Sequence, residues 1–158
     1  IVDGGALTIL ARTSLSFPTN QLILTPHKKE WEKLSGITIE KQQEDATASA
    51  LTSFPQGIIL VEKGPATRIW EVGQSDYYQL QVGGPYQATG GMGDTLAGII
   101  AGFAGQFKQA SLYERVAVAT HLHSAIAQEL SQEHYVVLPT EISSYLSKIM
   151  KKISQKGT

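Results

Sequence analysis

A glycine-rich stretch that passes into a helical pattern, between Ala88 and Gly102, is the feature that most constrains this sequence. Its first part, residues 89–93, holds three glycines in five residues, which lets the backbone turn tightly and direct several N–H groups toward one point. The part that follows predicts a helix with one buried face, because apolar residues recur at i, i+3, i+4 and i+7: Leu96, Ile99, Ile100 and Phe103. A glycine loop that opens a helix is suited to binding an anion, since free N–H groups and the positive end of the helix dipole meet there.

Asp94 lies in the first turn of this predicted helix, beside the predicted anion site. A carboxylate at that place is unfavourable for phosphate binding alone. It is well placed to accept a proton from a hydroxyl group that attacks a phosphate. However, an aspartate in a first turn often only caps its helix, and the local pattern leaves both interpretations open.

Composition narrows the class of protein. A chain of 158 residues is long enough for one domain with a substantial core. The net charge of −1 gives no electrostatic reason to expect nucleic acid or an anionic membrane as partner. The sequence has no cysteine, which excludes a disulfide framework and a thiolate zinc site and fits a cytoplasmic location.

Polar residues follow three apolar segments that are predicted as strands. They are Asp3, His27 and Lys63, which follow positions 1–2, 22–25 and 57–62. The carboxyl ends of parallel strands meet at one edge of a sheet, where α/β proteins bind their ligands. Each residue also has an ordinary explanation: Asp3 can cap the next helix, a lone histidine is usually structural, and a strand-end lysine is often only solvated.

The remaining patterns complete the predicted fold. Segments 67–72 and 77–82 alternate in character around a four-residue loop, which predicts an antiparallel hairpin. Two long amphipathic helices are predicted between residue 112 and the end of the chain. We therefore expect an α/β fold with a doubly wound, mostly parallel sheet that is flanked by helices and carries an antiparallel hairpin. His121 and His123 are two residues apart and cannot share a helical face, so no metal site is predicted there.

Four motifs resemble those of the ADP/ATP-dependent NAD(P)H-hydrate dehydratase family of the ribokinase-like superfamily. In chain order they are Val2–Leu7, Leu24–Glu30, Val61–Thr67 and Ala88–Gly98, and the last is the most specific. The resemblance runs the length of the chain but covers only the C-terminal part of the family's domain. We therefore expect residues 1–158 to be a single domain that forms the C-terminal portion of a larger ribokinase-like domain and lacks its N-terminal part.

The resemblance implies a carbon–oxygen lyase that repairs hydrated NADH or NADPH. ATP or ADP phosphorylates the hydroxyl group of the hydrate, and phosphate is then eliminated. Mg²⁺ is expected only because nucleotides transfer phosphate with it, and no metal-ligating residue is assigned. The resemblance also implies a homo-oligomer, for which a tetramer is one form.

Matching positions imply a role for each site residue. Asp94 contacts the hydrate and acts as general base, and His27 contacts the damaged dinucleotide. Backbone N–H groups for the transferring phosphate come from Gly91, Met92 and Gly93, and Gly93 also touches the nucleotide. The nucleotide is lined by Lys63, Gly64, Pro65, Ala66 and Thr67. The chain departs from the family at Gly5, where a second acid is common, so no acidic contact is expected from that position.

Two other functions stay open. A vitamin or sugar kinase of the same superfamily shares the Gly-x-Gly-Asp pattern, although the Thr-Pro-His and Lys-Gly-Pro-x-Thr motifs favour the dehydratase. A nucleotide-binding half-domain without turnover is the alternative outside the enzyme class.

Overall fold

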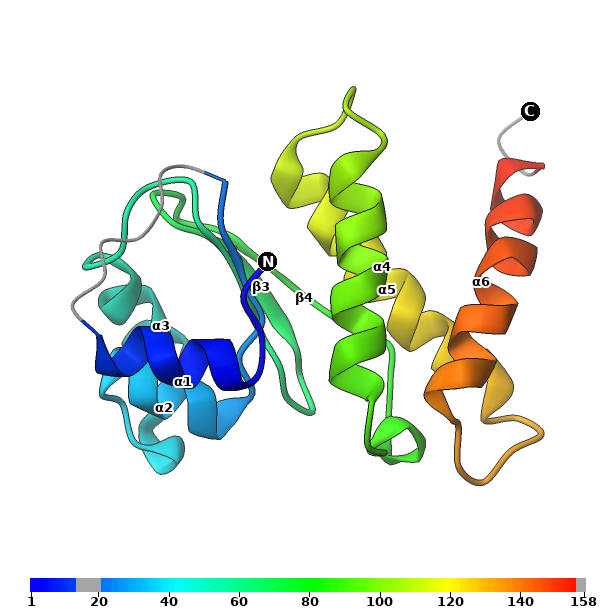
Figure 1. The fold of residues 1–158 in the computed structure, drawn as a ribbon, viewed down its shortest axis with the longest axis horizontal. Coiled ribbons are helices and arrows are strands. Elements are labelled where there is room, and N and C mark those ends of the chain that lie inside the picture. Colours follow the sequence, from blue (N-terminus) through cyan, green and yellow to red (C-terminus); the bar gives the residue numbers. More distant parts are fainter. Residues whose placement is uncertain (14–20, 156–158) are drawn as a thin grey trace.

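The computed structural model describes residues 1–13 and 21–155, and within them a sheet lies between two layers of helices (Figure 1). One layer contains the three short helices α1 (Gly5–Arg12), α2 (Lys28–Ser35) and α3 (Glu44–Leu51). The other layer contains α4 (Met92–Gly105), α5 (Leu112–Leu130) and α6 (Pro139–Ser154). Short 3₁₀ turns occur at Ile39–Lys41 and Pro85–Gln87. This layering is the predicted doubly wound arrangement.

The sheet has the strand order β1 (Ile23–Leu24), β2 (Ile59–Glu62), β3 (Arg68–Glu71) and β4 (Tyr77–Gln79). β1 and β2 are parallel, and Val2 adds a single parallel bridge to Leu24 on the far side of β1. β2–β3 and β3–β4 are antiparallel, so the sheet is mixed. The predicted hairpin is confirmed, with Ile69 opposite Tyr78.

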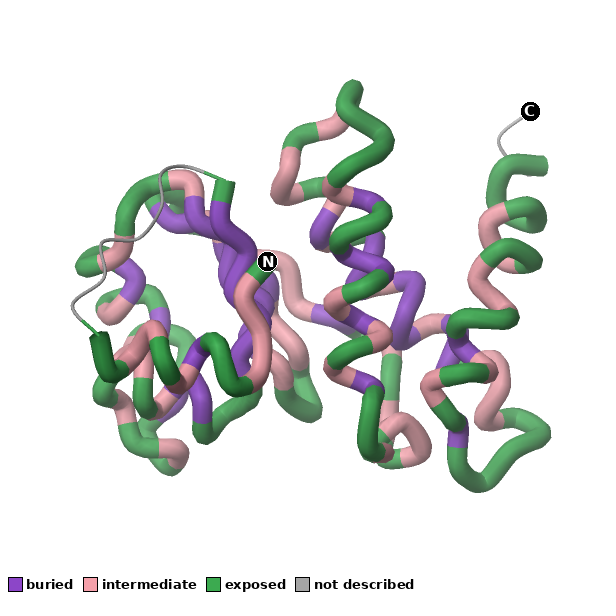
Figure 2. The backbone as a smooth tube through the Cα atoms, viewed as in Figure 1, coloured by how far each residue is buried: buried purple, intermediate pink, exposed green. Residues whose placement is uncertain are grey.

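Alternation along the strands divides the core between the two faces of the sheet. Ile59 and Val61 point toward α4 and α5 and belong to the larger apolar cluster. Ile58 and Leu60 point toward α1, α2 and α3, and pack with the fully buried Trp31. Figure 2 shows the buried segments gathered along the strands and on the inner sides of the helices. Since both faces are covered, the strands of this sheet read as nearly continuous apolar runs.

This arrangement brings the strand ends and the glycine loop together. Val2, β1 and β2 run in parallel, so the residues after them lie at one edge of the sheet. Residues 27 and 63 also form a parallel bridge just beyond β1 and β2. The amino end of α4 lies at the same edge, because a side chain placed on Gly93 would contact Lys63. No helix within the described residues is long and apolar enough to cross a membrane.

Candidate active site

The amino end of α4 presents backbone N–H groups without intrahelical acceptors, but the N–H of Met92, one of the expected donors, bonds to the Thr89 carbonyl oxygen at 3.4 Å. Gly91 is the N-cap residue, and among the described residues no side chain caps this helix. The first intrahelical hydrogen bond runs from the Thr95 N–H to the Gly91 carbonyl oxygen at 3.0 Å. The N–H groups of Gly93 and Asp94 precede this bond and so have no intrahelical acceptor. These N–H groups and the helix dipole together favour a bound anion.

Two of the three glycines in the loop, Gly91 and Gly93, differ in what they require. Gly91 has φ of 86°, the left-handed region that favours glycine, and a Cβ atom there would lie 3.3 Å from Pro139 Cγ. Gly93 lies inside α4 and has no positive φ. A Cβ atom on Gly93 would instead lie 3.3 Å from Lys63 Nζ and 3.6 Å from an oxygen of Asp3. Gly91 therefore shapes the turn, whereas Gly93 leaves room for charged groups.

Lys63 and Asp3 form an ion pair next to this helix end. The Nζ and Oδ1 atoms are 2.8 Å apart, and the Thr25 hydroxyl donates a 2.7 Å hydrogen bond to the same oxygen. Burial alone would raise the pKa of Asp3. The hydrogen bonds from Lys63 and Thr25 and the lysine charge outweigh burial, so the pKa of Asp3 is lowered. Asp3 is therefore a firmly ionised partner for Lys63.

His27 caps α2. Its Nδ1 atom accepts hydrogen bonds from the N–H groups of Lys29 (3.1 Å) and Glu30 (3.3 Å). The Glu30 carboxylate accepts a 2.9 Å bond from the His27 N–H, which completes a capping box. About half of the His27 side chain, 56%, stays exposed at the strand-end edge. The structural explanation that the sequence left open is therefore present. The Nε2 atom of the exposed ring lies 3.5 Å from Glu30 Oε1, so a ligand at this nitrogen would share it with that carboxylate.

Asp94 projects from the first turn of α4 into solvent. Its carboxylate makes no hydrogen bond or ion pair to any residue in ranges 1–13 and 21–155. The carboxylate is therefore available to a ligand that lies on the free N–H groups beside it.

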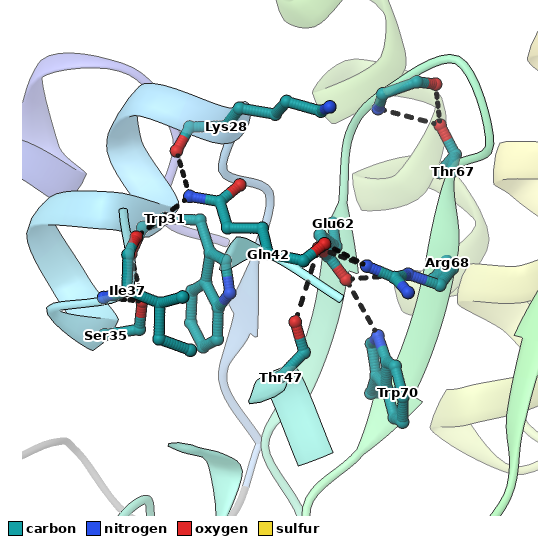
Figure 3. A network of polar contacts seen from close by, with 11 residues as sticks. Lys28, Trp31, Ser35, Ile37, Gln42, Thr47, Glu62, Thr67, Arg68 and Trp70 are labelled. Carbon is teal, nitrogen blue, oxygen red and sulfur yellow. Dashed lines mark hydrogen bonds and ion pairs between the residues drawn. The ribbon is translucent and has the colours of Figure 1, made fainter. Parts of the chain in front are cut away.

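A polar pocket of about 300 Å³ lies beside the turn between β2 and β3. Its lining includes four of the five residues expected at the nucleotide: Lys63, Gly64, Pro65 and Ala66. Thr67, the fifth residue, closes the turn, because its hydroxyl donates a 3.0 Å bond to the Gly64 carbonyl oxygen and accepts a 3.3 Å bond from the Gly64 N–H. Lys28 also lines the pocket, and its side chain extends toward this turn (Figure 3).

Two residues that line this pocket, Glu62 and Arg68, belong to a buried polar network (Figure 3). Glu62 accepts two hydrogen bonds from the Arg68 guanidinium, at 3.0 and 2.7 Å, and further bonds from Trp70 (3.2 Å) and Thr47 (3.4 Å). Arg68 also donates a 3.3 Å bond to the Gln42 carbonyl oxygen. A buried ion pair whose other polar atoms are also satisfied fixes geometry, so this network holds the turn in place.

The His123 side chain contacts the backbone of the glycine loop at the start of α4, a role that the sequence analysis did not identify. It lies on α5, is only 5% exposed, and faces the backbone of Met92. Burial lowers the pKa of His123 to about 4, although hydrogen bonding to Met92 partly opposes this shift. Its Nε2 atom has no hydrogen-bond partner in the described part of the chain. In the sequence, His123 is a polar residue among the apolar positions of a predicted helix. This pattern indicates a buried ring but does not show which residue the ring contacts.

The described residues contain no group of three or more histidine, aspartate or glutamate side chains that could hold a metal ion. Mg²⁺ commonly keeps several waters and binds through substrate phosphates and one or two carboxylates. The donor set at the α4 end, with Asp94 as an uncommitted carboxylate, fits an ion that arrives already bound to a nucleotide.

These features define a ribokinase-like α/β protein with an uncapped helix end at the edge of its parallel strands. The chain belongs to the NAD(P)H-hydrate dehydratase family, whose sequence model matches residues 1–148. A Streptococcus pneumoniae protein named ADP-dependent (S)-NAD(P)H-hydrate dehydratase is 88% identical over 99% of this chain and 54% of its own length.

Two solved structures show the same fold. A ribokinase-like superfamily protein from Enterococcus faecalis is 42% identical, with a TM-score of 0.86 over 96% of this chain and 51% of its own. The Bacillus subtilis ADP/ATP-dependent NAD(P)H-hydrate dehydratase, crystallised with ATP and Mg²⁺, is 27% identical, with a TM-score of 0.80 over 95% of this chain and 53% of its own. The chain therefore spans about half the length of the relatives that it matches.

Proposed function

We propose that this chain carries the phosphate- and nucleotide-binding part of an ADP/ATP-dependent NAD(P)H-hydrate dehydratase. The main support is the meeting of the Lys63 ammonium group, the free N–H groups of α4 and the Asp94 carboxylate at one edge of the sheet. Family membership supplies the reaction, and the named relatives support the choice of nucleotide.

The proposed reaction has two steps. In the first, the hydroxyl oxygen of the hydrate attacks the terminal phosphorus of ATP or ADP, and the nucleotide leaves with one phosphate fewer. Asp94 takes the hydroxyl proton. The N–H groups at the α4 end stabilise the negative charge on the transferring phosphate, as preorganised donors do in other enzymes. In the second step the carbon–oxygen bond breaks and inorganic phosphate leaves with the bonding electron pair. The neighbouring ring carbon loses a proton to the departing phosphate, and the ring double bond of NAD(P)H returns.

The two ligands are proposed to enter from opposite sides of Lys63. The nucleotide lies along the turn at residues 63–67, where the 300 Å³ pocket offers polar walls and the cation Lys28, whereas Arg68 is paired with Glu62. The hydrate lies toward His27 and Asp94. Mg²⁺, when bound with the nucleotide, would neutralise phosphate charge, and Asp94 is the carboxylate nearest to the helix end that could contact it.

The test is repair of NADH hydrate by the natural polypeptide that contains this chain. With ATP or ADP and Mg²⁺, the near-ultraviolet absorbance of the dihydronicotinamide should return, with release of one phosphate per molecule repaired. Running the assay with each nucleotide, and with NADPH hydrate as well as NADH hydrate, measures the preference for ATP or ADP and the preference between the two hydrates. If the hydrate is repaired with neither ATP nor ADP, the proposal is refuted.

The same assay separates the alternative functions. A vitamin or sugar kinase would form a stable phosphorylated product from its own substrate and leave NADH hydrate unchanged. A half-domain that only binds nucleotide would show saturable ADP binding without any turnover.

We further propose a cytoplasmic homo-oligomer, with a tetramer as one form. The absence of cysteine supports the location. An apolar groove of about 370 Å³ between α5 and α6, with the half-exposed Val118 and Ile153 on its walls, supports contacts between copies. Light scattering of the natural polypeptide measures the number of copies.

A further inference from the structure

The side chains of Asp3, Thr25 and Lys63 lie on the α4 face of the sheet. Val2 pairs with Leu24, and Leu24 pairs with Leu60, so the next residue in each strand lies level with its neighbours. Side chains alternate between faces, and Val61 belongs to the cluster on the α4 side. Lys63, two residues later, therefore points to the same side.

The side chains of Thr25 and Lys63 both bond to the same oxygen atom of Asp3. Asp3 Oδ1 lies 2.8 Å from Lys63 Nζ and 2.7 Å from the hydroxyl oxygen of Thr25. Thr25 is 1% exposed and its N–H also bonds to the Val2 carbonyl oxygen at 3.2 Å, so its hydroxyl group is held in place. Asp3 thus receives one bond from a fixed donor and uses the same oxygen to hold a flexible lysine.

The place where Lys63 is held is unfavourable for a cation. Its Nζ atom lies 3.3 Å from the position that a Cβ atom on Gly93 would take, beside the positive end of the α4 dipole. A lysine is stabilised near the carboxyl end of a helix and destabilised near the amino end. Lys63 therefore needs an anion at this point, and Asp3 is the one present in the protein itself.

We propose that Asp3 and Thr25 are positioning residues that hold the Lys63 ammonium group at the amino end of α4, where it acts on the transferring phosphate. This inference rests on the proposed function and assigns Lys63 to the phosphate that moves, apart from the turn residues Gly64–Thr67. When phosphate binds, the ammonium group lies between two anions and loses its repulsion from the helix end. Asp3 does not serve as the base, because its bonded oxygen is already occupied and its lowered pKa makes the carboxylate a weaker proton acceptor.

Kinetics on the natural polypeptide separate positioning from simple stabilisation. Asp3→Asn keeps the shape but releases Lys63, so kcat should fall about 10- to 100-fold, the range expected when a catalytic group is misplaced by about 1 Å. The KM for the nucleotide should stay within about threefold, since the positive charge remains available to the phosphates. Thr25→Val should show a smaller loss of kcat in the same direction, and Thr25→Ser, which restores the hydroxyl, should recover it.

Thr120→Val is the matched control. Thr120 is also 1% exposed, but its hydroxyl donates a 2.8 Å bond to the Val116 carbonyl oxygen within its own helix, α5. It should lower stability as Thr25→Val does and leave kcat within about twofold. Equal losses of kcat in both threonine variants, or an unchanged kcat in Asp3→Asn, would overturn the proposal.

An NMR measurement tests the same proposal without turnover. The ammonium ¹⁵N–¹H signal of Lys63, assigned through Lys63→Arg, should be visible in the free protein because the ion pair slows its exchange. ADP should shift this signal more than AMP, which lacks the β-phosphate. In Asp3→Asn the signal should disappear from the free protein and return with ADP. If wild-type protein repairs no hydrate but these shifts occur, the proposed function fails and the positioning role stands; a signal insensitive to both Asp3→Asn and ADP removes the positioning role.

Discussion

At the scale of single residues, Asp94 is the group on which the proposed chemistry depends. Asp94→Asn keeps the shape and removes the proton acceptor, so turnover should fall roughly 10²–10⁴-fold. Nucleotide affinity should hold or improve, because a negative charge beside the phosphate is lost. Steady-state kinetics and calorimetric titration of ADP measure the two effects. Asp76→Asn, in the exposed hairpin loop, is the control and should change neither; near-normal turnover in Asp94→Asn would remove Asp94 as the base.

His27 has two possible tasks that different substitutions separate. His27→Ala removes both the helix cap and the imidazole, so stability should fall by about 1 kcal/mol and affinity for the dinucleotide should weaken. His27→Asn supplies another capping side chain and should preserve stability while still weakening dinucleotide binding. Titration of NADH hydrate and of ATP, together with thermal unfolding, checks this. Normal dinucleotide binding by His27→Asn would leave capping as its sole task, and ATP binding should not change in either variant.

His123 makes the stability of the fold depend on pH. Its pKa is about 4 in the folded chain and 6.5 when unfolded, so the unfolded state binds more protons between these values. The contribution of neutral His123 is therefore complete above pH 6.5 and is lost as the pH falls toward 4. The full shift corresponds to about 3 kcal/mol. Between pH 4 and 6.5, the free energy of unfolding measured with urea should rise with pH. His123→Gln should remove this pH dependence, whereas His134→Gln, at an exposed position, should retain most of it.

At the scale of elements, two glycines of the loop, Gly91 and Gly93, are required for different physical reasons. Gly91→Ala forces a side chain into a left-handed conformation, at about 1–2 kcal/mol, and against Pro139. Gly93→Ala should leave stability equal or slightly higher, because alanine favours helix, but should displace the Lys63 ammonium group. Both should lower turnover by about 10²-fold, the usual effect of one misplaced donor.

The control for these variants lies in the same helix. A Cβ atom on Gly98 meets nothing within 4 Å among the described residues, so Gly98→Ala should raise stability and keep full turnover. Thermal unfolding and the hydrate assay compare the three variants. If Gly91→Ala and Gly93→Ala both behave like Gly98→Ala, the loop is only a turn.

The elements that the sequence predicted are those with a strong local pattern. The glycine loop and its helix, the hairpin and the two long helices follow from turn chemistry and periodicity alone. The pattern could not show that Asp3 and Lys63 meet, because these residues are sixty positions apart and their pairing depends on the register of three strand segments. It also missed the capping geometry of His27, which depends on side-chain direction. Nor could the pattern show which glycine of the loop needs a positive φ: Gly91 does, whereas Gly93 does not, since α4 already begins at Met92.

At the scale of the whole molecule, the β1 edge of the sheet is short. Among residues 1–13 and 21–155, the sheet continues beyond β1 only through the bridge at Val2, and the apolar Ile1 and Ile9 are 44% and 61% exposed. Unpaired strand edges beside apolar side chains are templates for association with other chains. The relatives that this chain matches are about twice its length, which supports the expectation that residues 1–158 form one portion of a larger ribokinase-like domain.

We therefore predict that residues 1–158, expressed by themselves, associate in solution and do not repair NADH hydrate, although the amino end of α4 is intact. Light scattering gives the mass in solution, and the ATP-dependent return of dihydronicotinamide absorbance gives the activity. Ile1→Lys places a charge at the open edge and should reduce association, since edge lysines oppose strand pairing. It should not restore activity, because the added charge changes association and adds no contact to the proposed site. A monomeric, active preparation of residues 1–158 would contradict the prediction.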